Sequence, residues 1–231
     1  MRLPLAVVCA AAMAATLALP ASAQTPPTAA QTAAYTGLHA AAQRGDMALL
    51  HKKLAAGADI NARDEHGRTP LHVAAFARQR EVIRALAAAG APLGLLENDR
   101  YDAVTIAAVA DDEETLRVLL AAGASARLVT SRYDGTALIA AAHLGHDGVV
   151  RQLIKAGAPL DHVNNLHWTA VIEAVVLGDG GRRHQATLKA LLDAGASTAL
   201  ADREGRTPLV LARARGYGEM VRLIEQAGTR R

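Results

Sequence analysis

The sequence predicts an all-α solenoid of about six helix-turn-helix units, because three of its patterns share one period. Glycines that follow an alanine recur at intervals of 33, 33, 34, 38 and 33 residues, and a threonine or aspartate precedes each at a nearly constant distance. A fixed period of this length is typical of stacked repeats, which bury their faces only against neighbours. The composition agrees, since 51% of residues are apolar but only 3% are aromatic. The glycines are Gly57, Gly90, Gly123, Gly157, Gly195 and Gly228.

The threonine or aspartate predicts where the first helix of each unit begins. Its side-chain oxygen can accept a hydrogen bond from an unpaired amide of the first helical turn. These residues are Thr36, Thr69, Asp102, Thr136, Thr169 and Thr207. Pro70 and Pro208 follow two of them, at the first helical position, where proline is favoured.

A small side chain recurs five residues after each predicted cap. The positions are Ala41, Ala74, Ala107, Ala141, Ala174 and Ala212. Alanine lets neighbouring helices approach closely, so we expect a larger residue there to push the repeats apart.

The second helix of each unit is predicted by apolar residues at helical spacing, such as Val82, Ile83 and Leu86. The recurring glycine predicts the end of this second helix, and we expect the glycine to take the left-handed conformation there. Polar, turn-rich segments such as residues 59–67 and 197–205 predict projecting hairpin loops between units.

Three segments, GRTPLHVAA (67–75), GADINARDEHG (57–67) and DREGRTPLVLA (202–212), resemble ankyrin repeats. The resemblance covers residues 35–228 and implies repeats at about 35–66, 67–99, 100–133, 134–166, 167–204 and 205–231. It also implies that His39, His72 and His146 brace the hairpins. The third and fourth units, with YDAVTIAA (101–108) and GTALIAAAHLGH (135–146), depart from the pattern, so we expect their hairpin tips to deviate.

The N-terminal 23 residues are typical of a secretory signal peptide. Arg2 precedes an apolar run from Leu5 to Leu19, and small residues follow at 21–23. We expect cleavage after Ala23 and a periplasmic location, with an uncleaved anchor as the alternative. Residues 24–34 form either a linker or an N-terminal cap of the array at 35–231. Because Cys9 lies in the signal segment, the mature chain would have no disulfide and no thiol chemistry.

The charge pattern argues against nucleic acid as a partner. The formal net charge is +3, or +2 without Arg2, and the charges are interspersed along the chain rather than clustered. We also expect no stable membrane insertion after cleavage, and a monomer.

Catalytic motifs are missing from the sequence. It has no Gly-x-Ser-x-Gly elbow and no cysteine after residue 9, so we expect no enzyme and no cofactor. The stretch LGDGGRRHQ (177–185) looks like a phosphate loop, but it follows a helix and lacks the spacing of phosphate-binding motifs. It adds five residues to the fifth unit. We interpret it as a surface insertion, with a recognition loop using Arg182, Arg183 and His184 as the alternative.

Two further candidate sites concern metal binding and acid-base chemistry. His162 and His167 have no cysteine or carboxylate cluster at ligand spacing, so we expect no metal. Glu173 stands where most units place an apolar residue, so it should be hydrogen-bonded to the hairpin or have an altered pKa. A role in acid-base catalysis would need a partner that the sequence does not identify.

The resemblance implies a protein-binding face formed by the hairpin tips and the first helices. Aromatic residues are rare in the chain, yet three of the six residues that precede the caps are aromatic, which favours a binding role. An apolar strip seven or eight residues after the caps would complete an interface core with a polar rim. The alternative is that some of these side chains pack on their neighbours. This predicted docking face consists of Arg68, Phe76, Tyr101, Val109, Tyr133, His143, Leu144, Trp168, Val176, Leu177 and Arg206.

The sequence therefore favours a non-catalytic protein-protein interaction module of the bacterial cell envelope. Two rival functions stay open. One is a ligand- or metal-binding regulator that uses the histidines and the basic insertion. The other is a chaperone-like protector of exported proteins, which would bind several clients weakly. The identity of a partner cannot be derived, because one scaffold serves many targets through its surface.

Overall fold

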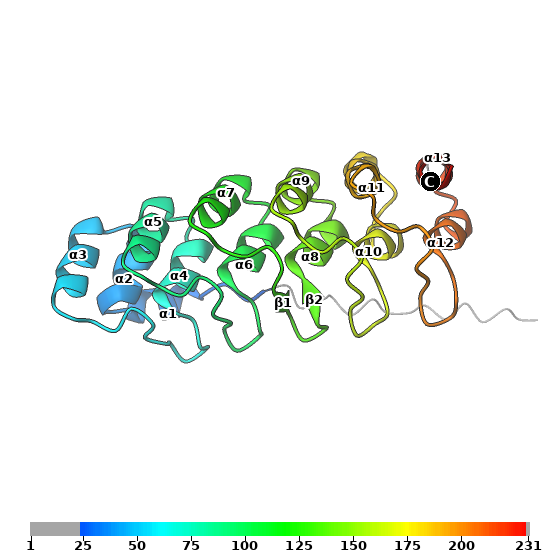
Figure 1. Cartoon of the computed structure of the whole chain (residues 1–231). Helices are drawn as coiled ribbons and strands as arrows, with labels where there is room; N and C mark the ends of the chain where they lie inside the picture. Colours follow the sequence, from blue (N-terminus) through cyan, green and yellow to red (C-terminus); the bar gives the residue numbers. More distant parts are fainter. Residues whose placement is uncertain (1–23, 230–231) are drawn as a thin grey trace, which may run out of the picture.

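Two parallel rows of helices make up the chain (Figure 1). The computed structural model describes residues 24–229, so the predicted signal peptide lies outside the described residues. After α1 (Ala29–Ala34), the first helices of the units are α2 (Gly37–Arg44), α4 (Pro70–Phe76), α6 (Ala103–Val109), α8 (Ala137–Leu144), α10 (Ala170–Val176) and α12 (Pro208–Ala214). The second helices are α3 (Met47–Ala55), α5 (Arg80–Ala88), α7 (Glu113–Ala121), α9 (Asp147–Lys155), α11 (Arg182–Asp193) and α13 (Gly218–Gly228). The predicted all-α solenoid is confirmed.

Every first helix begins directly after its predicted cap residue. The side chains of Asp102, Thr136 and Thr169 accept a hydrogen bond from the amide three residues later, as expected. Thr36 and Thr207 make no such bond. They belong to the end units and are not buried, whereas the caps of the four inner units are, so water can serve the helix termini at the ends.

The recurring glycine ends the second helix in five of the six units. Gly57, Gly90, Gly123, Gly157 and Gly195 have φ between 76° and 96°, in the left-handed region that glycine adopts without strain. The prediction is wrong for Gly228, which lies in the last turn of α13.

The alanine row lies at the centre of the packing. Ala41, Ala74, Ala107, Ala141, Ala174 and Ala212 are each at most 1% exposed. Each first helix contacts the first helix of the next unit as well as its own second helix. Because alanine fills these contacts, the helices of one row stack closely along the array.

The hairpin loops project to one side of the first helices (Figure 1). Most hairpin tips share one main-chain hydrogen bond. The amide of the first turn residue donates to the carbonyl four residues later, as from Asp64 to Arg68. The tip of the third unit has the same bond, from Glu97 to Tyr101, so the deviation expected there is wrong.

The fourth tip does deviate, because it alone in the described chain forms strands. β1 (Val129–Thr130) pairs antiparallel with β2 (Gly135–Thr136), with Val129 opposite Thr136 and Thr130 opposite Gly135. The glycine of this unit is shifted to lie beside the cap. Ser131 and Asp134 therefore take the left-handed conformation in the tip, at φ 64° and 51°.

Within residues 24–229, no helix combines the length and apolar composition that crossing a bilayer requires.

Candidate partner-docking face

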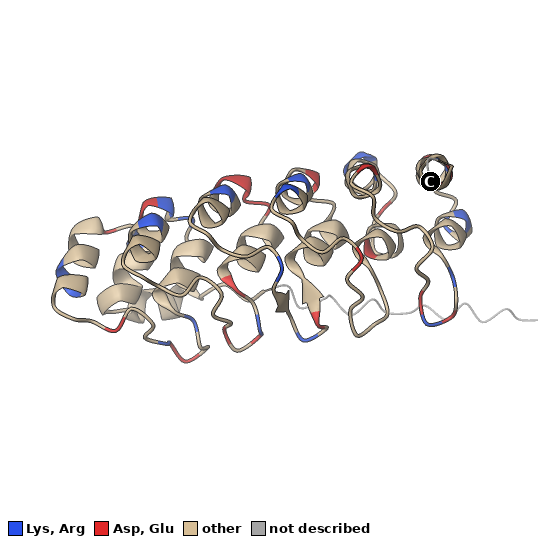
Figure 2. Cartoon of the chain, in the orientation of Figure 1, with Lys and Arg blue, Asp and Glu red and all other residues tan. Residues whose placement is uncertain are grey.

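Charged residues lie mainly outside the first helices (Figure 2). They lie mainly on the second helices and on the hairpin loops, while the row from α2 to α8 is largely uncharged. The predicted docking face therefore has an apolar middle between two charged borders, the arrangement of a protein interface core and its rim.

The C-terminal half of the predicted docking face is open to solvent. Tyr133, Leu144 and Leu177 are the most exposed of its apolar residues, at 40%, 39% and 42%. Tyr101, Val109, Trp168 and Val176 are half-buried, and of these Tyr101, Trp168 and Val176 pack against the core. Tyr101, Trp168 and Val176 therefore pack on their neighbours, as the alternative predicts, and still present part of their surface. The docking role of the strip stays a prediction.

Arg206, at the C-terminal end of this face, is exposed but not unpaired. Its guanidinium contacts Asp202 at 2.7 Å and Glu204 at 2.9 Å, both in the same hairpin. The Asp202 side chain is buried, at 1% exposed, whereas that of Glu204 is 62% exposed. Only the contact with Glu204 is therefore of the exposed kind that contributes little to stability.

Arg68 differs from its counterparts in the other units, because its side chain is only 2% exposed. Its guanidinium lies 3.5 Å from Asp64 and 5.7 Å from the centre of the Phe76 ring, and donates a 2.8 Å hydrogen bond to the Thr25 carbonyl. We expected an accessible side chain here. The N-terminal segment covers it, which periodicity within the repeats could not indicate.

Glu173 joins the fourth and fifth units beneath the docking face. Its side chain is buried, accepts a 3.0 Å hydrogen bond from the Asn164 amide, and lies 3.5 Å from Nδ1 of His143. Burial raises the pKa of Glu173 to about 7, against a smaller opposing effect of Asn164. The expected hairpin bond and altered pKa are both present, although the donor is a side-chain amide that the spacing did not reveal.

His143 is the more accessible member of this pair, with 29% of its side chain exposed. Burial lowers its pKa, and nearby His184 and His146 lower it further. The side chain of Glu173 is only 5% exposed, and its Oε2 is buried and accepts no hydrogen bond from the part of the chain that the structure describes. The pair can influence stability and the surface charge at His143.

The insertion of the fifth unit is fastened to its neighbours. Arg183, on the first turn of α11, reaches Asp111 at 2.9 Å and Asp147 at 3.5 Å, in the third and fourth units. His184 contacts Asp179 and the carbonyl of His143. Tyr217 of the sixth unit donates to the carbonyl of Gly178. Of the three proposed recognition residues, only Arg182 is exposed without a contact of this kind, which favours the structural interpretation of the insertion.

The histidines of the repeat motif bond to main-chain carbonyls. His39 lies 2.9 Å from the carbonyl oxygen of Arg68, His72 lies 2.9 Å from that of Leu95, and His146 lies 2.9 Å from that of Ala108. The first two brace the following hairpin, as the resemblance implies, whereas His146 braces the end of α6. Burial lowers the pKa of His72 to about 4, so this ring is neutral at physiological pH.

The other two histidines considered for metal binding also have local explanations. His162 contacts the carbonyl of Asp134 at 2.6 Å. His167 has φ 62°, at the hairpin position that Gly67 and Gly205 occupy in other units. Among residues 24–229, no group of three or more histidine, cysteine or acidic side chains is placed to hold a metal ion.

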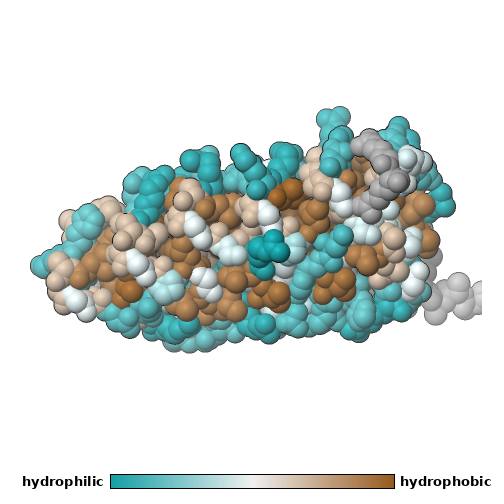
Figure 3. All heavy atoms as spheres, in the orientation of Figure 1, coloured by the Kyte–Doolittle hydropathy of each residue, from teal (hydrophilic) through white to brown (hydrophobic). Residues whose placement is uncertain are grey.

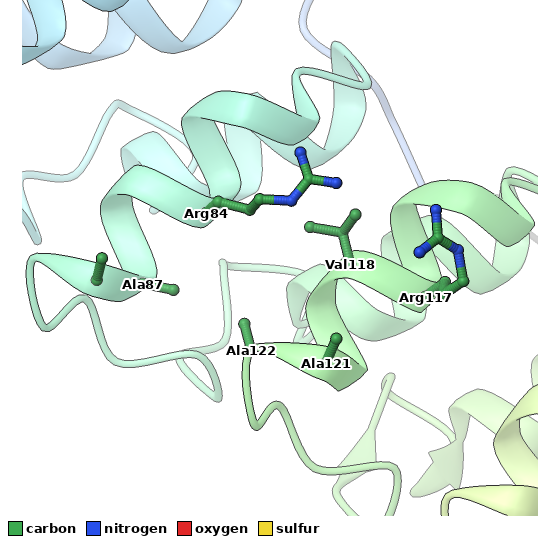
Figure 4. Close-up of a pocket in the computed structure, with 7 residues that line it drawn as sticks. Arg84, Ala87, Arg117, Val118, Ala121 and Ala122 are labelled. Carbon is green, nitrogen blue, oxygen red and sulfur yellow. The ribbon is translucent and has the colours of Figure 1, made fainter.

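Two further surfaces lie away from the predicted docking face. An open hollow of about 400 Å³ lies between α5 and α7, lined by small side chains and by Arg84 and Arg117 (Figure 4). Each arginine pairs with a glutamate one turn earlier on its own helix, so the two do not form a free cationic site. The face in Figure 3 carries an apolar band between hydrophilic borders.

A model of ankyrin repeats in three copies matches residues 15–97, 38–128 and 104–200 of the chain. The chain belongs to the ankyrin-repeat family. Repeats of this family are general protein-protein interaction modules and are generally non-catalytic.

Relatives of similar length support this assignment. The chain is 37% identical over 189 residues to the putative ankyrin repeat protein YahD of Escherichia coli K12, covering 81% of this chain and 94% of the relative. It is 43% identical to the ankyrin repeat domain ABAYE2397 of Acinetobacter baumannii AYE, with a TM-score of 0.78 and coverage of 83% and 97%. The ankyrin repeat protein EF0377 is 31% identical, with a TM-score of 0.76 and coverage of 83% and 98%.

Proposed function

We propose that this ankyrin array is a non-catalytic docking module, which binds another protein on the predicted docking face in the periplasm. The observation that carries the proposal is the exposure of large apolar residues on the fourth and fifth units, where Tyr133, Leu144 and Leu177 are exposed and Trp168 is half-buried. Tyrosine and tryptophan in an apolar, charge-bordered surface are the residues that dominate protein binding.

The periplasmic location rests on the sequence of residues 1–23. The apolar run and the small residues before position 24 are those of an exported protein. A fusion of the full chain to a reporter that is active only after export tests this part separately. Loss of reporter activity on replacing Leu5–Leu19 with a polar stretch is expected, and unchanged activity would contradict export by this segment.

Affinity capture from an envelope extract of the source bacterium tests the docking proposal. The bait is the chain from residue 24 to 231, beside a Tyr101→Ala, Trp168→Ala variant and a Leu144→Glu, Leu177→Glu variant. We expect one protein to be retained by the parent chain and its retention to fall at least tenfold in both variants, because each removes central contacts of about 1–2 kcal/mol.

The matched control changes Arg84 and Arg117 to alanine, on the opposite side of the array. This control should capture as much as the parent chain. The glutamate variant alters only exposed residues, so its loss of binding cannot be attributed to unfolding. Equal capture by all variants would contradict the proposed surface, and many weakly bound proteins would indicate a chaperone-like protector instead.

A further inference from the structure

An N-terminal arm, residues 24–34, lies against the first hairpins of the array. Its extended part, residues 24–28, leads into α1 from the side of the later units and is seen below the first helices in the view of Figure 1. In α1, Gln31 donates a 2.7 Å hydrogen bond to Glu65 of the hairpin tip. The arm is thus held at two points, by α1 at the tip and by its extended part at Arg68.

The contact at Arg68 has the form of a main-chain recognition site. Nη1 of the guanidinium lies 3.5 Å from Asp64 and 3.5 Å from Gln31, the guanidinium carbon lies 5.7 Å from the centre of the Phe76 ring, and Nη2 donates to the Thr25 carbonyl. Arg68 and Phe76 both belong to the predicted docking face. The arm therefore occupies part of the surface that a partner would contact.

The arm satisfies this site only in part. Within residues 24–229, Nε of Arg68 and Nε2 of Gln24 are both buried without a hydrogen-bond partner. An unsatisfied buried donor reduces stability, so another segment that supplies acceptor oxygens here would fit better than the arm does.

We propose that residues 24–28 are a tethered occupant of the docking face, and that a partner inserts an extended peptide segment at Arg68 by displacing them. The inference rests on the proposed docking function. The displacing segment presents a main-chain carbonyl or a carboxylate to the guanidinium. The tether gives the arm a local concentration in the millimolar range, so weak binders are excluded and a strong partner is admitted.

Two prolines set how strongly the arm competes. Pro26 and Pro27 restrict the free arm to extended conformations close to the docked one. Glycine at both positions increases the disorder of the free arm and so releases it from the array without shortening the chain.

Binding of a free arm peptide tests the proposal. A fluorescent peptide with the sequence of residues 24–34 is titrated with the chain 24–231 and with its Pro26→Gly, Pro27→Gly variant. We expect the variant to bind the peptide about 4- to 30-fold more tightly, because its own arm competes less. Adding Arg68→Lys to the variant should weaken binding at least tenfold, since lysine lacks the planar fork.

The position of the arm is measured separately with thiol labelling. The chain from residue 24 has no cysteine, so Gln24→Cys introduces a single thiol. We expect it to react at least tenfold more slowly than a thiol at exposed Ala30, and the double-glycine change to remove this protection. All variants are first compared with the parent chain by thermal unfolding.

Three results would overturn the proposal. Equal labelling at positions 24 and 30 would show that the arm is not docked. Absence of peptide binding to the double-glycine variant at millimolar concentration would show that Arg68 is not a receptor for such a segment. Equal capture of a partner by the parent and the double-glycine variant would show that the arm does not compete, while the proposed docking function would stand.

Discussion

Ala107→Leu is expected to lower the free energy of unfolding by about 1–3 kcal/mol, which corresponds to a fall in Tm of about 3–10 °C for a chain of this size. Ala107 is 1% exposed and lies mid-array, between the equivalent alanines Ala74 and Ala141. Leucine adds three carbon atoms where α6 meets its neighbours. Since repeats are stabilised only by adjacent repeats, the strain cannot be distributed over a common core.

Thermal unfolding followed by circular dichroism measures this effect. The matched control is Ala121→Leu, which places the same side chain on the exposed side of α7 in the same repeat. We expect the control to remain within about 0.5 kcal/mol of the parent chain. An unchanged Tm for Ala107→Leu would contradict the packing described for the alanine row.

Glu173→Gln is expected to raise the free energy of unfolding relative to the parent chain at high pH. This difference between the two proteins should be about 2–3 kcal/mol larger at pH 8 than at pH 4.5. The folded-state pKa of Glu173 is raised from 4.5 to about 7, so the folded state binds this proton more tightly than the unfolded state does. The stabilisation is complete below pH 4.5 and is lost as the pH rises to about 7. Glutamine retains an acceptor for Asn164 and cannot ionise.

Urea unfolding of both proteins at several pH values between 4.5 and 8 tests this prediction. His143 faces Glu173, and His72 also titrates with a lowered pKa, but both are present in the two proteins. The difference between the proteins therefore isolates the carboxyl group. Glu81→Gln, on the exposed surface of α5, is the control that should follow the parent chain. Parallel plots of unfolding free energy against pH for Glu173→Gln and the parent chain would contradict the raised pKa of Glu173.

The periodic part of the fold could be predicted from the sequence because the same local physics recurs in each unit. The cap at Thr69, the buried alanine at Ala74 and the left-handed glycine at Gly90 each have counterparts one period away. The errors lie where a unit loses its neighbours or changes register. Thr207 makes no capping bond in the last unit, and the shifted Gly135 produces the paired strands.

The candidate site was less predictable, because its decisive contacts cross between repeats. Arg183 pairs with Asp111, 72 residues earlier, and no local pattern signals that distance. The sequence identified Glu173 as unusual but not its neighbours Asn164 and His143. The burial of Arg68 depends on the arm, which lies outside the repeat pattern altogether.

Site-specific photo-crosslinking in the source bacterium tests the central claim, partner docking on this face, most directly. A photoreactive amino acid replaces Tyr133 or Leu144 on the docking face, or Arg84 on the opposite side, in the full-length chain. We predict that irradiation yields one discrete adduct from positions 133 and 144 and none from position 84. Adducts from position 84 alone, or no adduct from the docking face in cells that contain the folded protein, would contradict the account.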